Sequence, residues 1–258
     1  MNIPEETNLK NKDALDSISI AAFDVDARIF RTLWHTLLKT PDVVTAGLKG
    51  DYSTYLSPIR VFVALFGLQF AIAAIFGVPM TLNTDTFLSE MPADTVDQWL
   101  NGNDQVDIDR TLNEWLSLSL WPTTVVGSIP YLVLLKLYRP SLSWWGHTII
   151  YLTTSNASFT FMVVFLPFFP LGEITMIIGA LGGALVYLGI MGRNIAHFYS
   201  KTWSGTLFRM LGIFLLLPLT MLFSTIVQFF AADWILKSNF SLSFFELIKA
   251  ASNSGASP

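Results

Sequence analysis

One run of oxygen-bearing side chains has nearly the spacing of a calcium-binding loop. Four members alternate along the chain and an acid follows twelfth, as in such loops. These residues are Asn103, Gln105, Asp107, Asp109 and Glu114. The sixth position, where the sharp turn needs glycine, is Ile108, and the first and third positions are uncharged amides. We therefore expect a solvated acidic segment rather than a calcium site, with docking of a partner protein as the alternative.

The other groups that could perform catalysis are few. The chain has no cysteine, which removes thiol chemistry and thiolate metal sites. Its three imidazoles are His35, His147 and His197. The sequence contains no zinc-type pairing of histidine and glutamate, no Ser–His arrangement and no paired aspartates within an apolar stretch. We therefore expect no catalytic residue, no metal ligand and no cofactor.

Polar side chains are concentrated in the apolar stretch Trp145–Pro167. They include Thr148, Thr153, Thr154, Ser155, Asn156, Ser158 and Thr160. Inside a bilayer such groups must be satisfied by the protein itself. They either line a substrate path or form hydrogen bonds between helices, which contribute about 1 to 2 kcal/mol or less each. We favour packing, and Ser155, Asn156 and Ser158 are the central polar group.

Small residues form a face on the next apolar stretch. Its members are Gly179, Ala180, Gly182, Gly183 and Ala184. Small residues four positions apart let two membrane helices approach closely. We predict a helix-contact face here, and its partner is either the fifth span or another subunit.

Five cationic or imidazole side chains are candidates for contact with lipid headgroups. They are Arg28, Arg31, Lys39, Arg193 and His197. The first three lie on one side of a helix predicted over residues 24–39, opposite Phe30, Leu33, Trp34, Leu37 and Leu38. Such a helix either lies in the membrane interface or packs its apolar face on the protein. The last two end the fourth apolar stretch, where cytoplasmic anchors are also expected.

Five apolar stretches must position these residues. They are Ile59–Val78, Trp115–Tyr138, Trp145–Pro167, Leu171–Met191 and Leu207–Ala231. Each is close to the ~20 apolar residues that cross ~30 Å of hydrocarbon. The composition agrees, with 52% hydrophobic and 13% charged residues and a mean hydropathy of +0.53. The sequence predicts an all-α, polytopic membrane bundle of about five transmembrane helices plus an N-terminal amphipathic interfacial helix.

Basic residues give the predicted orientation. All but Arg110, Lys237 and Lys249 of the 15 Lys and Arg residues fall on one side if the N-terminus is cytoplasmic. We expect a multi-pass protein of the cell inner membrane with its C-terminus external. The alternative is that residues 145–191 form one re-entrant unit instead of two spans.

The chain is accordingly divided into four parts. Residues 1–16 are a disordered N-terminus, 17–58 a cytoplasmic amphipathic helical arm, 59–231 the bundle, and 232–258 an external short helix and tail. The bundle includes an acidic outer loop over 79–114. In that loop Pro92–Leu100 predicts a short helix that Asn101 and Gly102 stop. Ser243 and Glu246 have the spacing of a capping box for the C-terminal helix.

The start of the chain carries a family resemblance. Its motifs are Arg31-Thr32-Leu33, Leu38-Lys39-Thr40-Pro41, Gly47-Leu48-Lys49-Gly50-Asp51, Tyr55 and Ser57-Pro58-Ile59-Arg60. A basic amphipathic helix, a Leu-x-x-Pro break and a Gly/Tyr/Pro membrane entry resemble a bacterial multi-span membrane family with a domain of unknown function. The five-span plan is similar to that of the Yip family. That resemblance implies interaction and membrane-organising roles, and it implies no active site.

Three classes of function follow. We expect a non-enzymatic membrane protein that acts as an accessory or scaffold subunit, or that organises lipid. The alternative is a small-molecule or lipid transporter built around the third span, and the weakest reading is a membrane enzyme. The expected partners are the bilayer and another membrane protein or a second copy, and no nucleic acid.

Overall fold

The computed structural model describes residues 28–78, 84–89 and 91–254, and all regular secondary structure in these ranges is helical. This confirms the predicted all-α class. The elements are α2 (Thr40–Lys49), α3 (Pro58–Phe76), α4 (Asp85–Leu88), α5 (Ala93–Leu100), α6 (Gln105–Tyr138), α7 (Trp144–Phe165), η1 (Leu166–Leu171), α8 (Glu173–Phe198), α9 (Trp203–Phe240) and α10 (Phe244–Ser254). A further helical segment covers residues 28–38. The predicted disordered N-terminus, 1–16, lies outside the described residues.

Five helices are long and apolar enough to cross a membrane: α3, α6, α7 with η1, α8 and α9. The five-span, multi-pass prediction is therefore confirmed by length and composition. A 3₁₀ segment, η1, continues α7, and Gly172 with φ 127° separates it from α8. Only glycine adopts this backbone conformation readily. The helices on both sides of Gly172 are each long and apolar enough to cross a membrane, which favours two spans over one re-entrant unit for residues 145–191.

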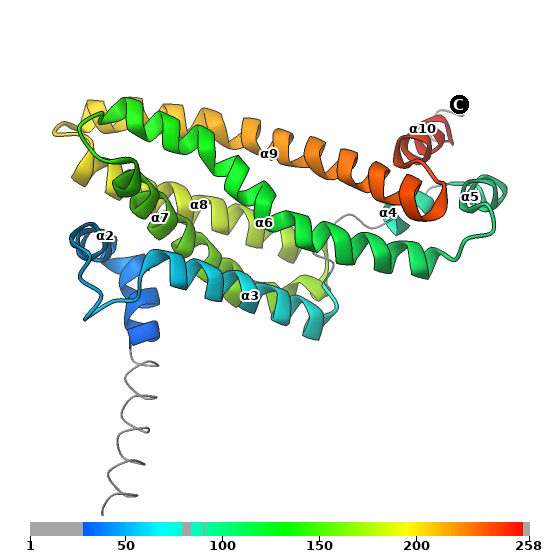
Figure 1. Ribbon diagram of the computed structural model, residues 1–258, viewed down its shortest axis with the longest axis horizontal. Coiled ribbons are helices and arrows are strands. Elements are labelled where there is room, and N and C mark those ends of the chain that lie inside the picture. The colour runs from blue at the N-terminus through cyan, green and yellow to red at the C-terminus, as the bar shows by residue number, and fades with distance from the viewer. Residues whose placement is uncertain (1–27, 79–83, 90, 255–258) are drawn as a thin grey trace, which may run out of the picture.

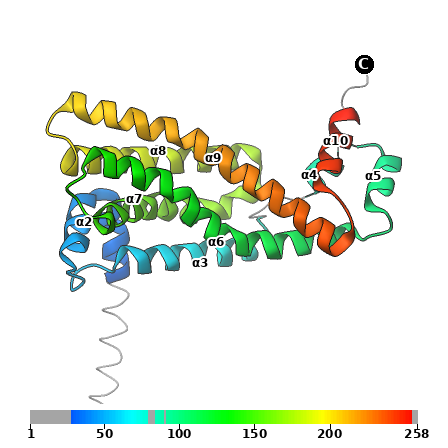
Figure 2. The same cartoon turned by 45° about the horizontal axis from the view of Figure 1, so that its top comes forward.

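Helices α6 and α9 are longer than a bilayer requires. They have 34 and 38 residues, or about 51 and 57 Å of helix at 1.5 Å per residue. They lie side by side and continue past the ends of α3, α7 and α8, as Figures 1 and 2 show. The extra length corrects the sequence-based boundaries, since α6 begins before Trp115 and α9 ends after Ala231. Part of the predicted outer loop is therefore helix.

The protruding ends of α6 and α9 join α4, α5 and α10 in a compact unit, here called the head. Its buried core includes Leu88, Met91, Trp99, Ile108, Leu112, Leu116, Ala232, Ile235, Leu236, Leu242, Phe244 and Leu247. The α6 members of this core are spaced i, i+4, i+8 and therefore lie on one face of the helix. Burial of this face, and of the matching side chains of α9, explains why both long helices continue beyond the apolar stretches. The head and α2 lie at opposite ends of the molecule (Figure 1).

The short helices of the head begin and end where the sequence signals them. Helix α5 ends at Leu100, followed by left-handed Asn101 (φ 49°) and Gly102 (φ 82°), as predicted. The capping box predicted for α10 is replaced by a contact from another helix. The Ser243 hydroxyl donates to Asp233 Oδ1 of α9 at 2.7 Å, and the backbone N–H of Phe244 donates to the same oxygen at 3.0 Å.

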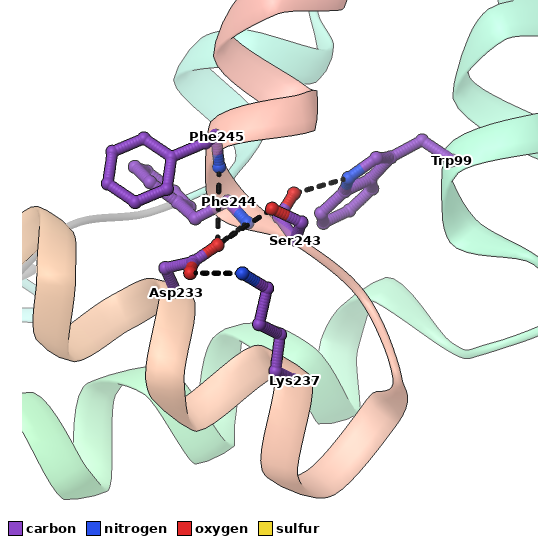
Figure 3. A network of polar contacts seen from close by, with 6 residues as sticks. All are labelled: Trp99, Asp233, Lys237, Ser243, Phe244 and Phe245. Carbon is purple, nitrogen blue, oxygen red and sulfur yellow. Dashed lines mark hydrogen bonds and ion pairs between the residues drawn. The ribbon is translucent and has the colours of Figure 1, made fainter.

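Figure 3 shows this network from close by. Asp233 Oδ2 also accepts from the ammonium of Lys237 at 2.8 Å, one turn further along α9. The indole N–H of Trp99 donates to the carbonyl of Ser243, in the linker between α9 and α10, at 3.1 Å. One carboxylate of α9 thus satisfies the free N–H groups at the start of α10, and an indole of α5 holds the same linker.

Candidate functional site

The small-residue face of α8 packs against α7 and η1 of the same chain. A Cβ built at Gly182 would lie 2.5 Å from Cε1 of Phe161, and one at Gly179 would lie 2.5 Å from Cε1 of Phe169. Real Cβ atoms essentially never come so close, so both positions need glycine for the observed approach. Gly183 likewise faces Met162. The glycines of this face therefore contact the third span of the same chain and not the fifth span.

The two alanines of the predicted face do not share this role. Ala180 is exposed. Ala184, one turn further on, lines a cavity between α6, α7, α8 and α9. The close approach of α7 and α8 thus positions one wall of that cavity.

The cavity has a volume of about 290 Å³. It lies near the middle of all four helices, and it is an open cleft rather than a sealed chamber. Hydroxyl side chains dominate the described residues that line it, namely Thr123, Thr124, Tyr131, Tyr151, Ser155, Ser158, Tyr187, Thr220 and Ser224. Leu120, Gly127, Phe159, Ala184 and Leu217 complete the lining. We call it the hydroxyl cavity.

Several of these hydroxyls already donate to backbone carbonyls. Thr123 and Thr124 donate to the carbonyls four residues earlier in α6, at 2.8 and 2.7 Å. Ser158 of α7 donates to the Gly183 carbonyl of α8 at 2.9 Å. Such hydroxyls keep free lone pairs, so they can still accept a hydrogen bond from a guest.

Three tyrosines form the aromatic part of the hydroxyl cavity. The ring of Tyr131 lies 5.7 Å from that of Tyr151 and 6.1 Å from that of Tyr187, measured between centroids. The Tyr131 hydroxyl is 3.0 Å from Thr220 Oγ1. The Tyr187 side chain is 8% exposed, and its hydroxyl has no hydrogen-bond partner among the described residues. A buried hydroxyl without a hydrogen-bond partner is destabilising unless a bound molecule supplies that partner.

An apolar groove adjoins the hydroxyl cavity. It lies between α6 and α9, has a volume of about 400 Å³, and shares Gly127 and Thr220 with the cavity lining. Its other lining residues are Val126, Ile129, Pro130, Leu219 and Phe223. Pro130 has no backbone N–H to donate, and α6 changes direction along its length (Figure 1). The two spaces together place a compartment with several hydroxyl groups in its lining beside one that is purely apolar.

The three polar residues predicted as a group on α7 do not face the same way in the structure. Ser155 and Ser158 line the hydroxyl cavity. Asn156 faces another way, and its side-chain amide donates to the Pro58 carbonyl at the start of α3 at 2.9 Å. A second interhelical bond joins the Asn194 amide of α8 to Thr154 Oγ1 of α7 at 2.9 Å. Both amides therefore tie helices together.

The helical segment 28–38 packs through a threonine face. Thr32 and Thr36 are 1% exposed, and Thr32 Oγ1 accepts from the backbone N–H of Leu56 at 3.0 Å. Phe30, Trp34 and Leu38, spaced four apart, are 74%, 61% and 54% exposed. Of the apolar residues in the predicted face, Leu33 packs on the bundle while this outer stripe does not.

The five headgroup candidates are not brought together. Arg31, Lys39, Arg193 and His197 are exposed. Arg193 donates to the Leu37 carbonyl at 3.1 Å and so ties α8 to the end of segment 28–38. Arg28 lines a cleft together with Arg60, a residue that the candidate set lacked.

Two buried tyrosines hold the same end of the bundle. The Tyr55 hydroxyl lies 2.7 Å from Nδ1 of His35, and the Tyr199 hydroxyl lies 2.8 Å from Nδ1 of His147. Burial raises the pKa of Tyr55, and the nearby Asp42 carboxylate raises it further. Burial also raises the pKa of Tyr199. Both phenols are therefore neutral at physiological pH and keep their hydrogen bonds.

Two acids of the calcium-like run, Asp107 and Asp109, and their neighbour Asp104 have structural roles. Asp104 caps α6 by accepting from the backbone N–H of Val106 at 3.0 Å. Asp107 pairs with Arg110 at 2.8 Å, and Asp109 accepts from the Thr84 hydroxyl at 2.7 Å. These acids start α6 and anchor the chain before α4.

The hydroxyl cavity offers donors, acceptors and aromatic faces, and none of the described side chains that line it carries a charge. Such a lining is suited to hold a neutral molecule by hydrogen bonds and contact. No family model, curated protein or solved structure matches this chain.

Proposed function

We propose that this protein is a non-enzymatic membrane protein that binds a neutral amphiphilic lipid inside its bundle. The polar end of the lipid occupies the hydroxyl cavity, and its hydrocarbon chain occupies the apolar groove beside it. This role belongs to the lipid-organising class. Release of the bound lipid on the other side of the membrane would make the protein a lipid carrier.

The observation that carries the proposal is the Tyr187 hydroxyl. It is buried at mid-span, and it has no partner among the described residues. A carbonyl or hydroxyl of a guest molecule would accept its hydrogen bond and remove the desolvation penalty.

The lining defines the chemistry of the guest. A charged headgroup would lose its hydration with no opposite charge in the described lining to offset that loss. A neutral hydroxyl, ester or ketone group, by contrast, finds several partners. The groove shares Gly127 and Thr220 with the cavity, so the two spaces are neighbours, and we propose that one molecule occupies both. A cleft at this depth opens to lipid chains, which makes the bilayer the natural source of the guest.

Placement in the cell inner membrane, with the N-terminus cytoplasmic and the C-terminus external, is part of the proposal. It is supported by the distribution of Lys and Arg, since all but three lie at the cytoplasmic side in this orientation.

An accessory role in a larger complex stays a prediction. The glycine face that favoured it is used within the chain, so its remaining support is the head at the far end of the molecule. Affinity isolation from native membranes followed by mass spectrometry tests it directly.

The lipid-binding proposal is tested with a diacylglycerol that carries a diazirine on its acyl chain. The protein is reconstituted in nanodiscs, irradiated and digested, and the labelled peptides are identified by mass spectrometry. We expect labelling on α6 and α9 around the apolar groove. The same experiment with a diazirine phosphatidylglycerol should label these peptides far less.

Variants make the test specific. Tyr187→Phe removes only the hydroxyl, and Ala184→Leu fills part of the cavity, so both should reduce labelling by several-fold. Tyr138→Phe is the matched control, because this hydroxyl donates to the Arg209 carbonyl outside the cavity. Labelling that is equal in all four proteins, with unchanged thermal stability, would overturn the proposal.

A further inference from the structure

A second cleft lies at the opposite end of the bundle from the head. It is bounded by the start of segment 28–38, the loop before α3 and the first turn of α3, and its volume is about 490 Å³. Its lining residues are Arg28, Tyr52, Tyr55, Leu56, Ser57 and Arg60. We call it the basic cleft.

Two guanidinium groups dominate the charge of the basic cleft. No acidic side chain is among its described lining residues. The nearest acid in sequence, Asp51, accepts hydrogen bonds from the Ser53 hydroxyl at 2.6 Å and the Ser53 N–H at 3.1 Å, and the Asp42 carboxylate lies near the lining residue Tyr55. The described residues show no ion pair of Arg60 with a carboxylate. Arg60 thus presents positive charge that a phosphate would match, with Arg28 beside it in the lining, and guanidinium groups bind phosphate through paired hydrogen bonds.

The apolar surface beside the cleft indicates where the phosphate comes from. Phe30, Trp34 and Leu38 form an exposed stripe along segment 28–38, whose threonine face is packed on the bundle. Ile59, next to Arg60, is also 41% exposed. An exposed aromatic and aliphatic stripe next to basic residues is typical of a helix that lies in the membrane interface. Arg60 belongs to the first turn of a span, so the cleft sits at interfacial depth.

From this juxtaposition we propose that the basic cleft binds the phosphate of an anionic phospholipid, while the Phe30, Trp34 and Leu38 stripe inserts into the adjoining leaflet. The site is separate from the hydroxyl cavity and takes a ligand of opposite character. It does not depend on the proposed function.

The test compares lipids and variants by native mass spectrometry of the full-length protein. The probes are phosphatidylglycerol, phosphatidylcholine and free glycerol phosphate, each titrated into the detergent-solubilised protein. We expect one phosphatidylglycerol to be retained in preference to phosphatidylcholine, and glycerol phosphate not to displace it. The double variant Arg28→Gln/Arg60→Gln should weaken this binding about tenfold or more, since each charge-assisted contact has a comparable effect.

The matched control is Lys49→Gln/Lys201→Gln, which removes the same charge from exposed positions outside both the cleft and segment 28–38. Its affinity for phosphatidylglycerol should stay within about twofold of wild type. An equal loss in both double variants would show a general effect of surface charge and would overturn the proposal. Displacement by glycerol phosphate would replace the lipid with a free phosphate ligand and also overturn it.

Two further variants keep the test decisive. If the Arg28 change prevents folding, Arg60→Gln alone is measured, because this exposed side chain lies at the surface of α3. In phosphatidylglycerol nanodiscs that contain a diazirine phosphatidylglycerol, Phe30→Ser/Trp34→Ser should reduce labelling of residues 28–38 several-fold and leave the thermal stability of the protein in detergent unchanged. Unchanged labelling of this segment would show that the stripe does not enter the leaflet, against the proposal.

Discussion

Asp233 accepts a hydrogen bond from the Ser243 hydroxyl at 2.7 Å, across the turn between α9 and α10 (Figure 3). The same carboxylate accepts from the Phe244 N–H at 3.0 Å, so it caps a helix to which it does not belong. Helix α10 has 11 residues and is too short to be stable alone. Its position in the head therefore depends on this carboxylate and on the buried ring of Phe244.

Replacement of Asp233 with alanine should loosen the head. The change leaves buried N–H and hydroxyl donors without an acceptor, and we expect the free energy of unfolding to fall by about 1 to 3 kcal/mol. Hydrogen exchange should rise most in residues 244–254. Asp97→Ala removes an exposed acid from α5 and should leave both measurements near wild type. If exchange in α10 were equal in the two variants, Asp233 would have no capping role.

The contact between α7 and α8 should be sensitive to a single methyl group. Gly182→Ala places a Cβ 2.5 Å from the Phe161 ring, which forces the two helices apart or the ring out of its position. We expect a loss of stability of about 1 to 3 kcal/mol, measured by thermal unfolding in detergent. Gly189 lies on the same helix with open space at its Cβ, so Gly189→Ala should be neutral or stabilising. Equal melting temperatures for the two variants would contradict the close packing of this face.

The sequence predicted the spans because their signal is local. A run of about 20 apolar residues has few alternatives, and five such runs became five helices of membrane length. The apolar runs alone do not give the ends of α6 and α9, because hydropathy falls outside the bilayer while the helix continues. Ile108 and Leu236 meet only in the folded head, and no local pattern shows that pairing.

The hydroxyl cavity was predicted only in part, because four helices build it. Ser155 and Ser158 stood out as neighbours in a polar stretch, whereas Tyr131 and Tyr187 stand among apolar residues in other spans. A partial signal existed, since hydroxyl residues recur one or two turns apart within single spans. That signal gives the face of each helix and leaves open which faces meet.

The bond between Asn194 and Thr154 should couple α7 to α8. Its length is 2.9 Å, and both residues are buried. In a double-mutant cycle with Asn194→Leu and Thr154→Val, we expect a coupling energy of about 0.5 to 1.5 kcal/mol from thermal unfolding. A cycle with Asn194→Leu and Thr148→Val, whose half-buried hydroxyl donates to the Trp144 carbonyl of its own helix, serves as control and should give a value near zero. Equal coupling in the two cycles would show that the bond makes no specific contribution.

The arrangement of the five spans has a direct test, because the chain contains no cysteine. Single cysteines at Thr54 and Gln98 stand in exposed positions of the loop before α3 and of the head. With a membrane-impermeant maleimide, we expect Gln98→Cys to react in intact cells and Thr54→Cys to react only after permeabilisation. One span, α3, lies between these two positions, so the five-span arrangement places them on opposite sides whatever the orientation. Reaction of both from one side would therefore contradict the five-span arrangement, whereas the reversed pattern would contradict only the cytoplasmic placement of the N-terminus.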